Sequence, residues 1–392
     1  MPGRPRRFQY ADVHNTSFVI GDDPSTWNAA FAETDIHGVF LLASGTAANI
    51  APELANIQSI WGSSITEMLA IMTSSPLLTF NRFHSYRLNG AARPDAEQGH
   101  EHFGFMDGIS QPAVNGFTNP VLPGQTPVDP GTFLLGETGD PGLDLRPHLG
   151  KRWLLVPEFN QFLTDNLLEV GELTPEQGSE LLGARMVGRW KSGAPIFLSP
   201  TADDPVLAAD PNRNNNFTYL LDVPNPNVEN HFNQTNCPFG AHIRKVHPRG
   251  DLDPAGENSH FIIRSSIPYG PEVTAAETAS STTSVDRGLA FVSYQASISN
   301  GFMFLQSIWI NNVGFIFGKV DPTIGVDPII GTLGGGPKNI SGLNPLVPVD
   351  ESSDFHDDPW NDVVIPKDFV ISRGGEYFFS PSLSGLGAIA AA

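Results

Sequence analysis

The stretch "LAFVSYQASISNGFMFLQSIWIN", residues 289–311, predicts a strand followed directly by a helix. Residues 289–298 are typical of a strand, and residues 299–311 carry apolar side chains at roughly helical spacing. Leu289 and Phe291 lie two positions apart on this strand, so their side chains point to the same face.

Helices and strands also alternate irregularly in the rest of the chain. Further helices are expected over residues 49–65, 155–171 and 174–188, the last with Thr174 as its N-cap, and a buried strand is expected over residues 36–44. Residues 202–230 are typical of a long polar loop. Because no regular βαβ alternation occurs, we predict an α+β fold with antiparallel sheets and helices on one face.

Composition excludes several classes of protein. The 392 residues are 40% hydrophobic, with 26 Phe, which indicates a globular chain with a large apolar interior. Acidic residues outnumber basic ones 42 to 22, and the net charge of −20 disfavours nucleic acid or an anionic membrane as a partner. The single cysteine, Cys237, allows no intrachain disulfide and no cysteine-based zinc site. No apolar run is long enough to predict a membrane span.

The segment "HFGFMDGISQP", residues 102–112, places one carboxylate, Asp107, among small and apolar neighbours. A carboxylate in such surroundings must find hydrogen-bond partners or shift its pKa. Gly104 and Gly108 allow tight backbone geometry on both sides of it. From the residues alone, a turn in which Asp107 caps its own backbone is favoured over a catalytic role.

Two further segments carry candidate functional residues. In "CPFGAHIRKVHPRG", residues 237–250, His242 lies among apolar neighbours, which is more often the pattern of a buried core histidine than of a ligand. The nearby Arg244, Lys245 and Arg249 would suit an anionic group such as a carboxylate.

In "HFIIRSSIPYGPEV", residues 260–273, Arg264 ends an apolar run and needs an anionic partner. That partner is either a structural aspartate or Asp107 across a pocket. His100 and His102 would share one face of a strand, but spacing fixes no third ligand, so a polar cluster beside Asp107 fits better than a metal site.

Together these segments resemble the dye-decolorizing peroxidases, a family of haem enzymes, over residues 27 to about 385. "GFMDGISQP" is similar to the G-x-x-D-G signature of the family, "CPFGAHIRK" to its proximal-ligand segment and "IIRSSIPYGPEV" to its distal-arginine segment. Residues 287–312 and 373–383 match further family segments, and the likeness is greatest to the fungal-type branch. The resemblance implies two ferredoxin-like domains in a dimeric α+β barrel arrangement. The N-terminal domain would span residues 1–145, and the haem-binding domain residues 146–392.

The resemblance also assigns roles to single residues. His242 would bind the iron of haem b axially, and Asp327 would accept a hydrogen bond from its other ring nitrogen. Asp107 and Arg264 would occupy the distal side, where peroxide enters. Asp107 would move a proton between the peroxide oxygens, and Arg264 would stabilise the anionic peroxide.

Other roles concern the pocket wall and the route of electrons. Leu289 and Phe291 match residues that wall the peroxide pocket. Bulky dyes cannot enter a pocket of that size, so electrons must reach the haem from a surface site. Tyr269 and Trp309 lie where the family places residues that carry such electrons, although a core position on an apolar helix face explains Trp309 equally well.

The implied substrates are hydrogen peroxide and aromatic small molecules, namely dyes, phenols and lignin-like compounds. We expect no nucleic-acid or membrane partner, and a monomer or weak homo-oligomer. Activity at acid pH is expected because an aspartate, with an ordinary pKa of about 3.9, is a base where a histidine would be protonated. An extracellular location is expected, although "MPGRPRRFQY" shows no signal peptide.

The sequence departs from the family in two places. No V-Q-G-D-I-like strand precedes Trp27, and "RPHLGKRWLL", residues 146–155, stands where a strand is expected before "VPEFNQFL". We therefore expect an incomplete N-terminal domain with an exposed sheet edge and weakened haem retention. The alternative function is a haem-binding or inactive variant without turnover. A hydrolase is disfavoured because no nucleophile motif occurs.

Overall fold

The computed structural model describes residues 21–28, 31, 39, 41–42, 44, 46–61, 90, 93–140, 148–220, 234–317, 324–345, 363–382 and 384. The strand expected over residues 36–44 falls mostly outside these ranges, as does much of the expected N-terminal domain. The expected domain boundary at residues 145 and 146 lies wholly outside them.

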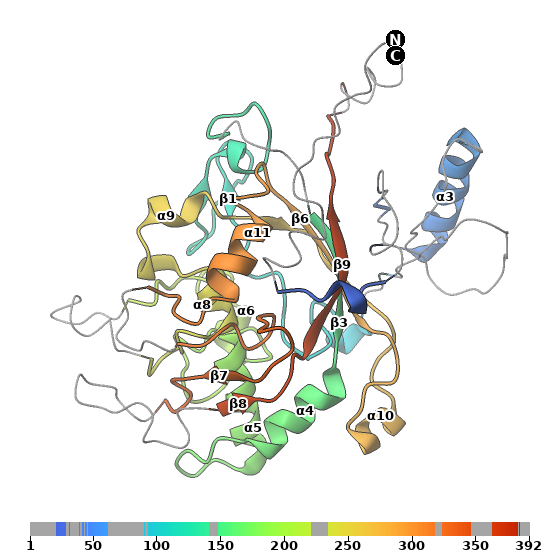
Figure 1. Cartoon of the computed structure of the whole chain (residues 1–392). Coiled ribbons are helices and arrows are strands. Elements are labelled where there is room, and N and C mark those ends of the chain that lie inside the picture. Colours follow the sequence, from blue (N-terminus) through green and yellow to red (C-terminus); the bar gives the residue numbers. More distant parts are fainter. Residues whose placement is uncertain are drawn as a thin grey trace.

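An antiparallel sheet in the order β4-β6-β3-β9, with β5 also paired to β6, forms the centre of the described structure (Figure 1). Its strands are β3 (His148–Leu154), β4 (Ile263–Arg264), β5 (Ile267–Tyr269), β6 (Gly288–Tyr294) and β9 (Val370–Tyr377). Two smaller pairs are β1 (Ala113–Val114) with β2 (Pro127–Val128), and β7 (Lys338–Ile340) with β8 (Val363–Ile365). The sheet joins segments that are far apart in the sequence, so residues of β4, β5 and β6 come together.

The segment 146–155 was expected to lack a strand, and this expectation is wrong. β3 pairs with both β6 and β9 and so lies inside the sheet. The basic residues Lys151 and Arg152 interrupt the apolar pattern that predicts a strand. In the folded protein each of them has a partner. The Lys151 ammonium lies 2.6 Å from Asp286 Oδ2, and the Arg152 guanidinium lies over the Phe302 ring, 5.3 Å from its centroid. A charged residue can therefore occupy a central strand here without an unpaired charge.

The helices confirm most of the sequence-based expectations. They are α3 (Ala47–Trp61), α4 (Val156–Asp165), α5 (Pro175–Val187), α6 (Pro205–Ala209), α8 (His242–Val246), α9 (Pro254–Asn258), α10 (Ala275–Ser280), α11 (Phe302–Phe304) and the π-helix η6 (Leu305–Ile310). Single 3-10 turns are η1 (Pro24–Thr26), η3 (Asp95–Glu97), η4 (Pro130–Thr132) and η5 (Arg249–Asp251). Thr174 caps α5 as expected, in a capping box with Gln177. The expected loop over residues 202–230 contains α6, and its residues 221–230 lie outside the described structure.

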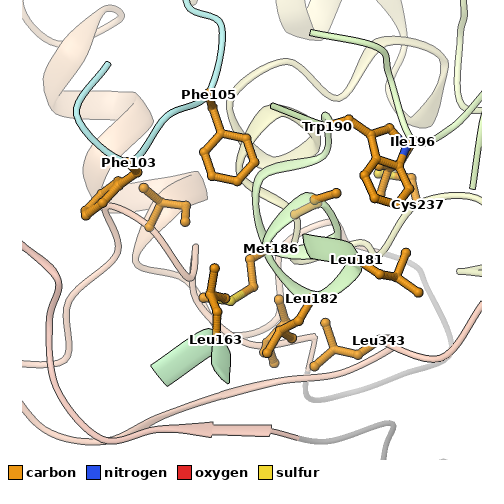
Figure 2. Close-up of a cluster of buried hydrophobic side chains, with 14 of the residues drawn as sticks. Phe103, Phe105, Leu163, Leu181, Leu182, Met186, Trp190, Ile196, Cys237 and Leu343 are labelled. Atoms are coloured by element: carbon orange, nitrogen blue, oxygen red, sulfur yellow. The ribbon is translucent and has the colours of Figure 1, made fainter. Parts of the chain in front are cut away.

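The largest hydrophobic cluster packs α4 and α5 against the segment that precedes Asp107. Figure 2 shows the Phe105 ring directed toward the side chains around Met186, and the Phe103 ring lies 4.4 Å from that of Phe159 on α4, centroid to centroid. Phe105 comes so near α5 that a Cβ atom on Gly183 would lie 3.2 Å from its ring. The two phenylalanines therefore anchor the loop that carries Asp107 to the helical core.

Within the ranges that the structure describes, no helix has both the length and the apolar character needed to cross a bilayer.

Candidate active site

The Asp107 loop has the tight geometry that its glycines predict. Gly104 and Gly108 both have positive φ values, +92° and +79°. The backbone N–H of Asp107 donates to Gly99 O at 2.8 Å, and that of Met106 donates to Lys191 O at 3.1 Å. The Asp107 carboxylate accepts the Gly108 N–H at 2.8 Å, which is the local turn cap expected from the residues alone. That cap uses only part of the carboxylate's capacity to accept hydrogen bonds.

Glu101 holds the turn that precedes Asp107. Its carboxylate accepts the backbone N–H of Phe103 at 2.8 Å and that of Phe105 at 3.1 Å. Burial raises the pKa of Glu101 to about 7, although both backbone bonds and Arg93 oppose the shift. Arg93 donates to the Glu101 carbonyl at 2.7 Å and grips Glu272 with two further bonds, at 2.9 and 2.6 Å. The bidentate Arg93–Glu272 ion pair connects this loop to the segment that follows β5.

Arg264, at the end of β4, forms an ion pair with Asp107. Of the two partners considered for Arg264, the structure selects Asp107. Neither side chain is fully buried, since Arg264 is 27% and Asp107 32% exposed, so a small molecule can reach the pair. Burial would raise the pKa of Asp107, but the Arg264 charge and its hydrogen bond outweigh burial and hold that pKa below its ordinary value.

His242 is the first residue of α8, and Asp327 orients its ring. Nδ1 of His242 donates to Asp327 Oδ2 at 2.7 Å. Asp327 is fully buried and also accepts the backbone N–H of Ile329 at 2.8 Å and of Ile330 at 3.0 Å. Burial would lower the pKa of His242, but the Asp327 carboxylate outweighs burial and raises it. The same pairing keeps the pKa of Asp327 below its usual range despite its burial.

The arrangement around His242 fits a haem. The charges of Asp107 and Arg264 both influence the pKa of His242, so the three side chains lie within range of one another's electrostatic interaction. The structure records no hydrogen bond at Nε2 of His242 among the described residues, and 21% of its side chain is exposed. A neutral imidazole with Nδ1 bound to a carboxylate and Nε2 free is the usual form of an axial iron ligand. His242 and Asp327 therefore have the donor chemistry that the proximal side of a haem needs.

β6 supplies the predicted wall residues. Leu289 and Phe291 are only partly buried, whereas Ala290 and Val292, which alternate with them, are buried. The alternation confirms that Leu289 and Phe291 point to one face of the sheet. The Phe291 ring lies 5.4 Å from the Phe302 ring of α11, centroid to centroid.

The basic residues after His242 are not available to an external anion, and this corrects the expectation from the sequence. Arg244 is buried and bonds both oxygens of Asp251, at 2.7 and 2.9 Å. Lys245 donates to the carbonyls of Trp309 and Asn312. Arg249 donates to the carbonyls of Asn215 and Phe217, 2.9 Å away in each case. All three residues donate to oxygen atoms of the protein, because burial leaves no water to accept these bonds, and Arg249 Nε is recorded without a partner among the described residues.

His100 and His102 find no third metal ligand among the described residues. Across the described ranges, no group of three His, Cys, Asp or Glu side chains is placed to hold a metal ion. His102 is buried, and its Nε2 donates to the Tyr269 carbonyl at 2.9 Å. It thus adds a second tie between the Asp107 loop and the segment after Arg264.

Tyr269 and Trp309 are both buried, so a dye cannot touch either ring directly. The role of electron carrier that the sequence predicted for both residues stays a prediction. The Tyr269 hydroxyl donates to Asp286 Oδ1 at 3.1 Å. The Trp309 ring stacks on Phe315 with 5.0 Å between centroids, and Phe315 touches Phe317, which is 56% exposed. The core position considered for Trp309 is therefore the one it occupies.

Comparison with known proteins identifies the family. A family model described as "DyP dimeric alpha+beta barrel domain" matches residues 6–75, and one described as "Dyp-type peroxidase, C-terminal" matches residues 209–315. A dye-decolorizing peroxidase of Mycena epipterygia is 70% identical over 97% of this chain and 73% of its own length. The chain belongs to the dye-decolorizing peroxidases. The predicted family, fold class and enzyme class are thereby confirmed.

Further relatives of this dye-decolorizing peroxidase are also fungal. Peroxidase 2 of Mycetinis scorodonius is 50% identical over 93% of this chain and 68% of its own length. A crystal structure of a dye-decolorizing peroxidase from Auricularia auricula-judae has a TM-score of 0.81 at 45% identity, covering 96% of this chain and 80% of that one. The protein is thus a haem-dependent peroxidase of the fungal type that acts on dyes.

The sequence analysis of this peroxidase missed three residues beside the site: Arg93, Glu101 and Gln111. Gln111 lies inside the quoted motif and bonds the backbone of Arg264. Glu101 stands directly before the quoted segment, where its position beside His102 was the only signal. Arg93 had no local signal, because its partner Glu272 is 179 residues away.

Proposed function

We propose that this peroxidase processes hydrogen peroxide with Asp107 and Arg264 beside a haem b held by His242. The supporting observation is the accessible Asp107–Arg264 ion pair within electrostatic range of the His242–Asp327 pair. When bound, the haem supplies the redox chemistry, accepting oxidising equivalents from peroxide and returning to its resting state with electrons from aromatic donors. The chain contains one cysteine, which excludes the C-x-x-C-H attachment of c-type haem and supports the b type.

Asp107 is the proton carrier in this proposal. It accepts a proton from one peroxide oxygen and gives that proton to the other, which leaves as water, so no net proton is consumed by the residue. Because Arg264 holds the pKa of Asp107 below its ordinary value, the carboxylate keeps its charge to lower pH than an ordinary aspartate does. Arg264 donates hydrogen bonds to the anionic peroxide and offsets the charge that develops as the O–O bond breaks.

Asp327 sets the proximal side. Its hydrogen bond from Nδ1 fixes the ring orientation of His242 and the position of the proton, so Nε2 is the nitrogen that would hold the iron. Two backbone N–H groups hold the carboxylate itself, so Asp327 cannot turn away from the histidine. A partly anionic histidine donates more electron density to iron and favours its oxidised states.

Phenols and lignin-like aromatics, in addition to dyes, are the proposed electron donors, and Trp309 is the proposed internal carrier. The carbonyl of its neighbour Ile310 accepts the Asp327 N–H at 2.9 Å, and Asp327 in turn bonds His242 at 2.7 Å. Outward, the Phe315 and Phe317 rings connect Trp309 to the surface. Tyr269 lacks a comparable bonded route among the described contacts, so we place it second.

An extracellular location is part of the proposal. Arg264 keeps the pKa of Asp107 low, and the net charge of the chain is −20. Both features suit a protein that works in mildly acid surroundings. Detection of the native protein in culture fluid, with none retained in washed cells, would support this location. Retention inside the cells would overturn it.

The function is tested on purified holoprotein by its absorption spectrum. A Soret band that changes when peroxide is added, followed by dye oxidation with an acid optimum, is expected. Asp107→Asn is expected to keep the haem and lose about 100-fold or more of its rate with peroxide. Asp129→Asn, an exposed carboxylate that bonds Asn115, is the matched control and is expected to match wild type.

Two outcomes would contradict the proposal. A fully active Asp107→Asn with a neutral optimum would remove Asp107 from the chemistry. Failure of the wild-type chain to take up haem would instead support the alternative of an inactive variant.

A further inference from the structure

The side chain of Gln111 bonds both backbone groups of Arg264. Its Nε2 donates to the Arg264 carbonyl at 2.6 Å, and its Oε1 accepts the Arg264 N–H at 3.2 Å. The two bonds close a ring that includes the Cα atom of Arg264, because the N–H and the C=O of one residue belong to adjacent peptide groups. Apart from the ladder bonds of the sheet, these are the bonds that the described structure records for the two backbone groups of Arg264.

The position of β4 in the sheet explains why Arg264 needs this partner. Among the strands that the structure describes, β4 lies at the edge of the sheet and pairs only with β6, with Arg264 opposite Ser293. A strand residue directs its N–H and C=O to the same edge. Those of Arg264 point away from β6, because the ladder bond to β6 is made by the next residue, from the Ser265 N–H to the Val292 carbonyl. The Gln111 amide therefore takes the place of the missing neighbouring strand.

Further hydrogen bonds fix the loop that carries Gln111. Its neighbour Ser110 bonds the side chain of Asn215 and also the guanidinium groups of Arg189 and Arg249, at 3.3 and 3.2 Å. Gln125 donates to the Gln111 carbonyl at 3.3 Å. The amide is therefore a fixed point to which β4 is attached, not a mobile surface group.

Asp107 lies four residues before Gln111 on this loop, and the Arg264 side chain forms the ion pair with Asp107. One loop thus holds the carboxylate directly and the backbone of its arginine partner through Gln111. Movement of β4 along its free edge would change where the guanidinium lies, even with both distal residues present.

We infer that Gln111 is a positioning residue, which fixes the backbone of Arg264 so that its guanidinium meets Asp107 and peroxide in one arrangement. The inference rests on the distal roles proposed above for Asp107 and Arg264. Gln111 belongs to the "DGISQP" segment. In the inferred role it contacts neither peroxide nor haem and acts only through Arg264.

Two substitutions test these bonds in different ways. Gln111→Met keeps the approximate length of the side chain and removes both bonds, so the second-order rate constant with peroxide is expected to fall about 10- to 100-fold. Gln111→Glu keeps the shape, and a protonated carboxyl offers one O–H donor and one acceptor, as the amide does. The ionised carboxylate offers acceptors only, and so it repels the Arg264 carbonyl.

The pH profile of the glutamate variant is therefore diagnostic. The charged groups around position 111 are Arg264 on β4, Asp107 on the same loop, and Arg189 and Arg249 behind Ser110. In holoenzyme stopped-flow measurements, the ratio of the Gln111→Glu rate constant to that of Gln111→Met is expected to increase as pH falls from about 6 to about 3, because a carboxyl group protonates near 4.3. Wild-type protein sets the reference profile at each pH.

Hydrogen exchange gives a readout that does not depend on activity. The Arg264 amide of the holoenzyme is expected to exchange at least about tenfold faster in Gln111→Met, since its acceptor is gone. Gln177→Met is the matched control, because it also removes a glutamine-to-backbone bond but at the start of α5. It is expected to leave both the Arg264 amide and the peroxide reaction as in wild type.

Three results would overturn the inference: an unchanged peroxide reaction in Gln111→Met, unchanged exchange at Arg264, or a Glu-to-Met ratio that does not vary with pH. Failure of the proposed function itself would look different. In that case wild-type protein would lack the peroxide reaction, while the exchange at Arg264 would still respond to Gln111→Met.

Discussion

Asp107 and Arg264 stand 157 residues apart in the sequence and form an ion pair that is only partly buried. Loop and strand are joined there by the Gln111 amide and, further back, by the Arg93–Glu272 and His102–Tyr269 bonds. A partly exposed pair is open to a molecule the size of peroxide, whereas a fully buried one would serve stability alone.

The first prediction concerns the acid limb of the pH–rate profile. Burial raises the pKa of Asp107, and Arg264 is the main opposing influence. Arg264→Met removes that opposition, so the pKa of Asp107 is expected to rise above its ordinary value. Because the base must be deprotonated, the acid limb should move to higher pH, and the rate should also fall at every pH. Stopped-flow rate constants between pH 3 and 7, a range of about 4 units around the ordinary carboxyl pKa, give the profile.

Arg264→Lys is the control for this prediction, because it keeps the charge but not the fork of donors. Its acid limb should lie between those of wild type and Arg264→Met. An acid limb that stays in place in Arg264→Met would show that another group controls it.

The second prediction concerns the haem potential. Asp327→Asn retains an oxygen that can accept the Nδ1 hydrogen of His242 but removes the negative charge. Without that charge, burial is no longer opposed and the pKa of His242 is expected to fall. The less basic ligand donates less electron density, so the reduction potential of the bound haem should become more positive. Spectroelectrochemical titration measures it.

Asp368→Asn, which disturbs the 3.1 Å contact with Lys338, serves as a comparison variant in the same half of the chain. Its potential should equal that of wild type. Equal potentials in wild type and Asp327→Asn would rule out an electronic effect of Asp327 on the proximal ligand.

The third prediction separates bulky from small electron donors. Trp309→Phe keeps a ring against Phe315 but removes the readily oxidised indole. Turnover of a large dye should fall by about tenfold or more, while the reaction with peroxide stays unchanged. Trp190→Phe, which also removes a buried indole and its bond to Ser199, should leave the dye reaction intact. Equal losses in both variants would point to general destabilisation.

Local patterns predicted what depends on neighbours in the sequence. The Thr174 cap of α5, strand β6 and the shared face of Leu289 and Phe291 all follow from spacing within a few residues. The family segments likewise placed Asp107, His242 and Arg264 on their own elements before any contact between them was known.

Local sequence patterns could not predict contacts between segments that are far apart along the chain. β3 was missed because Lys151 finds Asp286 135 residues away, and that pairing lets a basic residue sit inside the sheet. The sequence left the core position of Trp309 as one of two alternatives, and its contacts include the His260 ring, 5.4 Å away between centroids, from a distant segment. Gln111 was missed for the same reason, since its partner lies 153 residues away.

The last prediction concerns stability and pH. Burial raises the pKa of Glu101 from 4.5 to about 7 in the folded protein. The folded state therefore binds a proton more tightly than the unfolded chain, and this contribution to stability is fully present below pH 4.5 and is lost as pH rises through 7. Glu101→Gln cannot titrate, so its unfolding free energy should lack this decline, which is on the order of 2–3 kcal/mol in wild type. Urea unfolding at both pH values measures the difference.

Glu272→Gln provides the contrast, because the pKa of Glu272 is shifted in the opposite direction to that of Glu101. The hydrogen bond from Arg93 is the main cause that lowers the pKa of Glu272. Its contribution to stability is therefore present at neutral pH and lost as pH falls through the lowered pKa. Relative to wild type, Glu272→Gln should lose more stability at neutral pH than at acid pH, whereas Glu101→Gln should gain at neutral pH. Parallel pH profiles for wild type and Glu101→Gln would mean that the Glu101 carboxyl titrates normally in the folded protein.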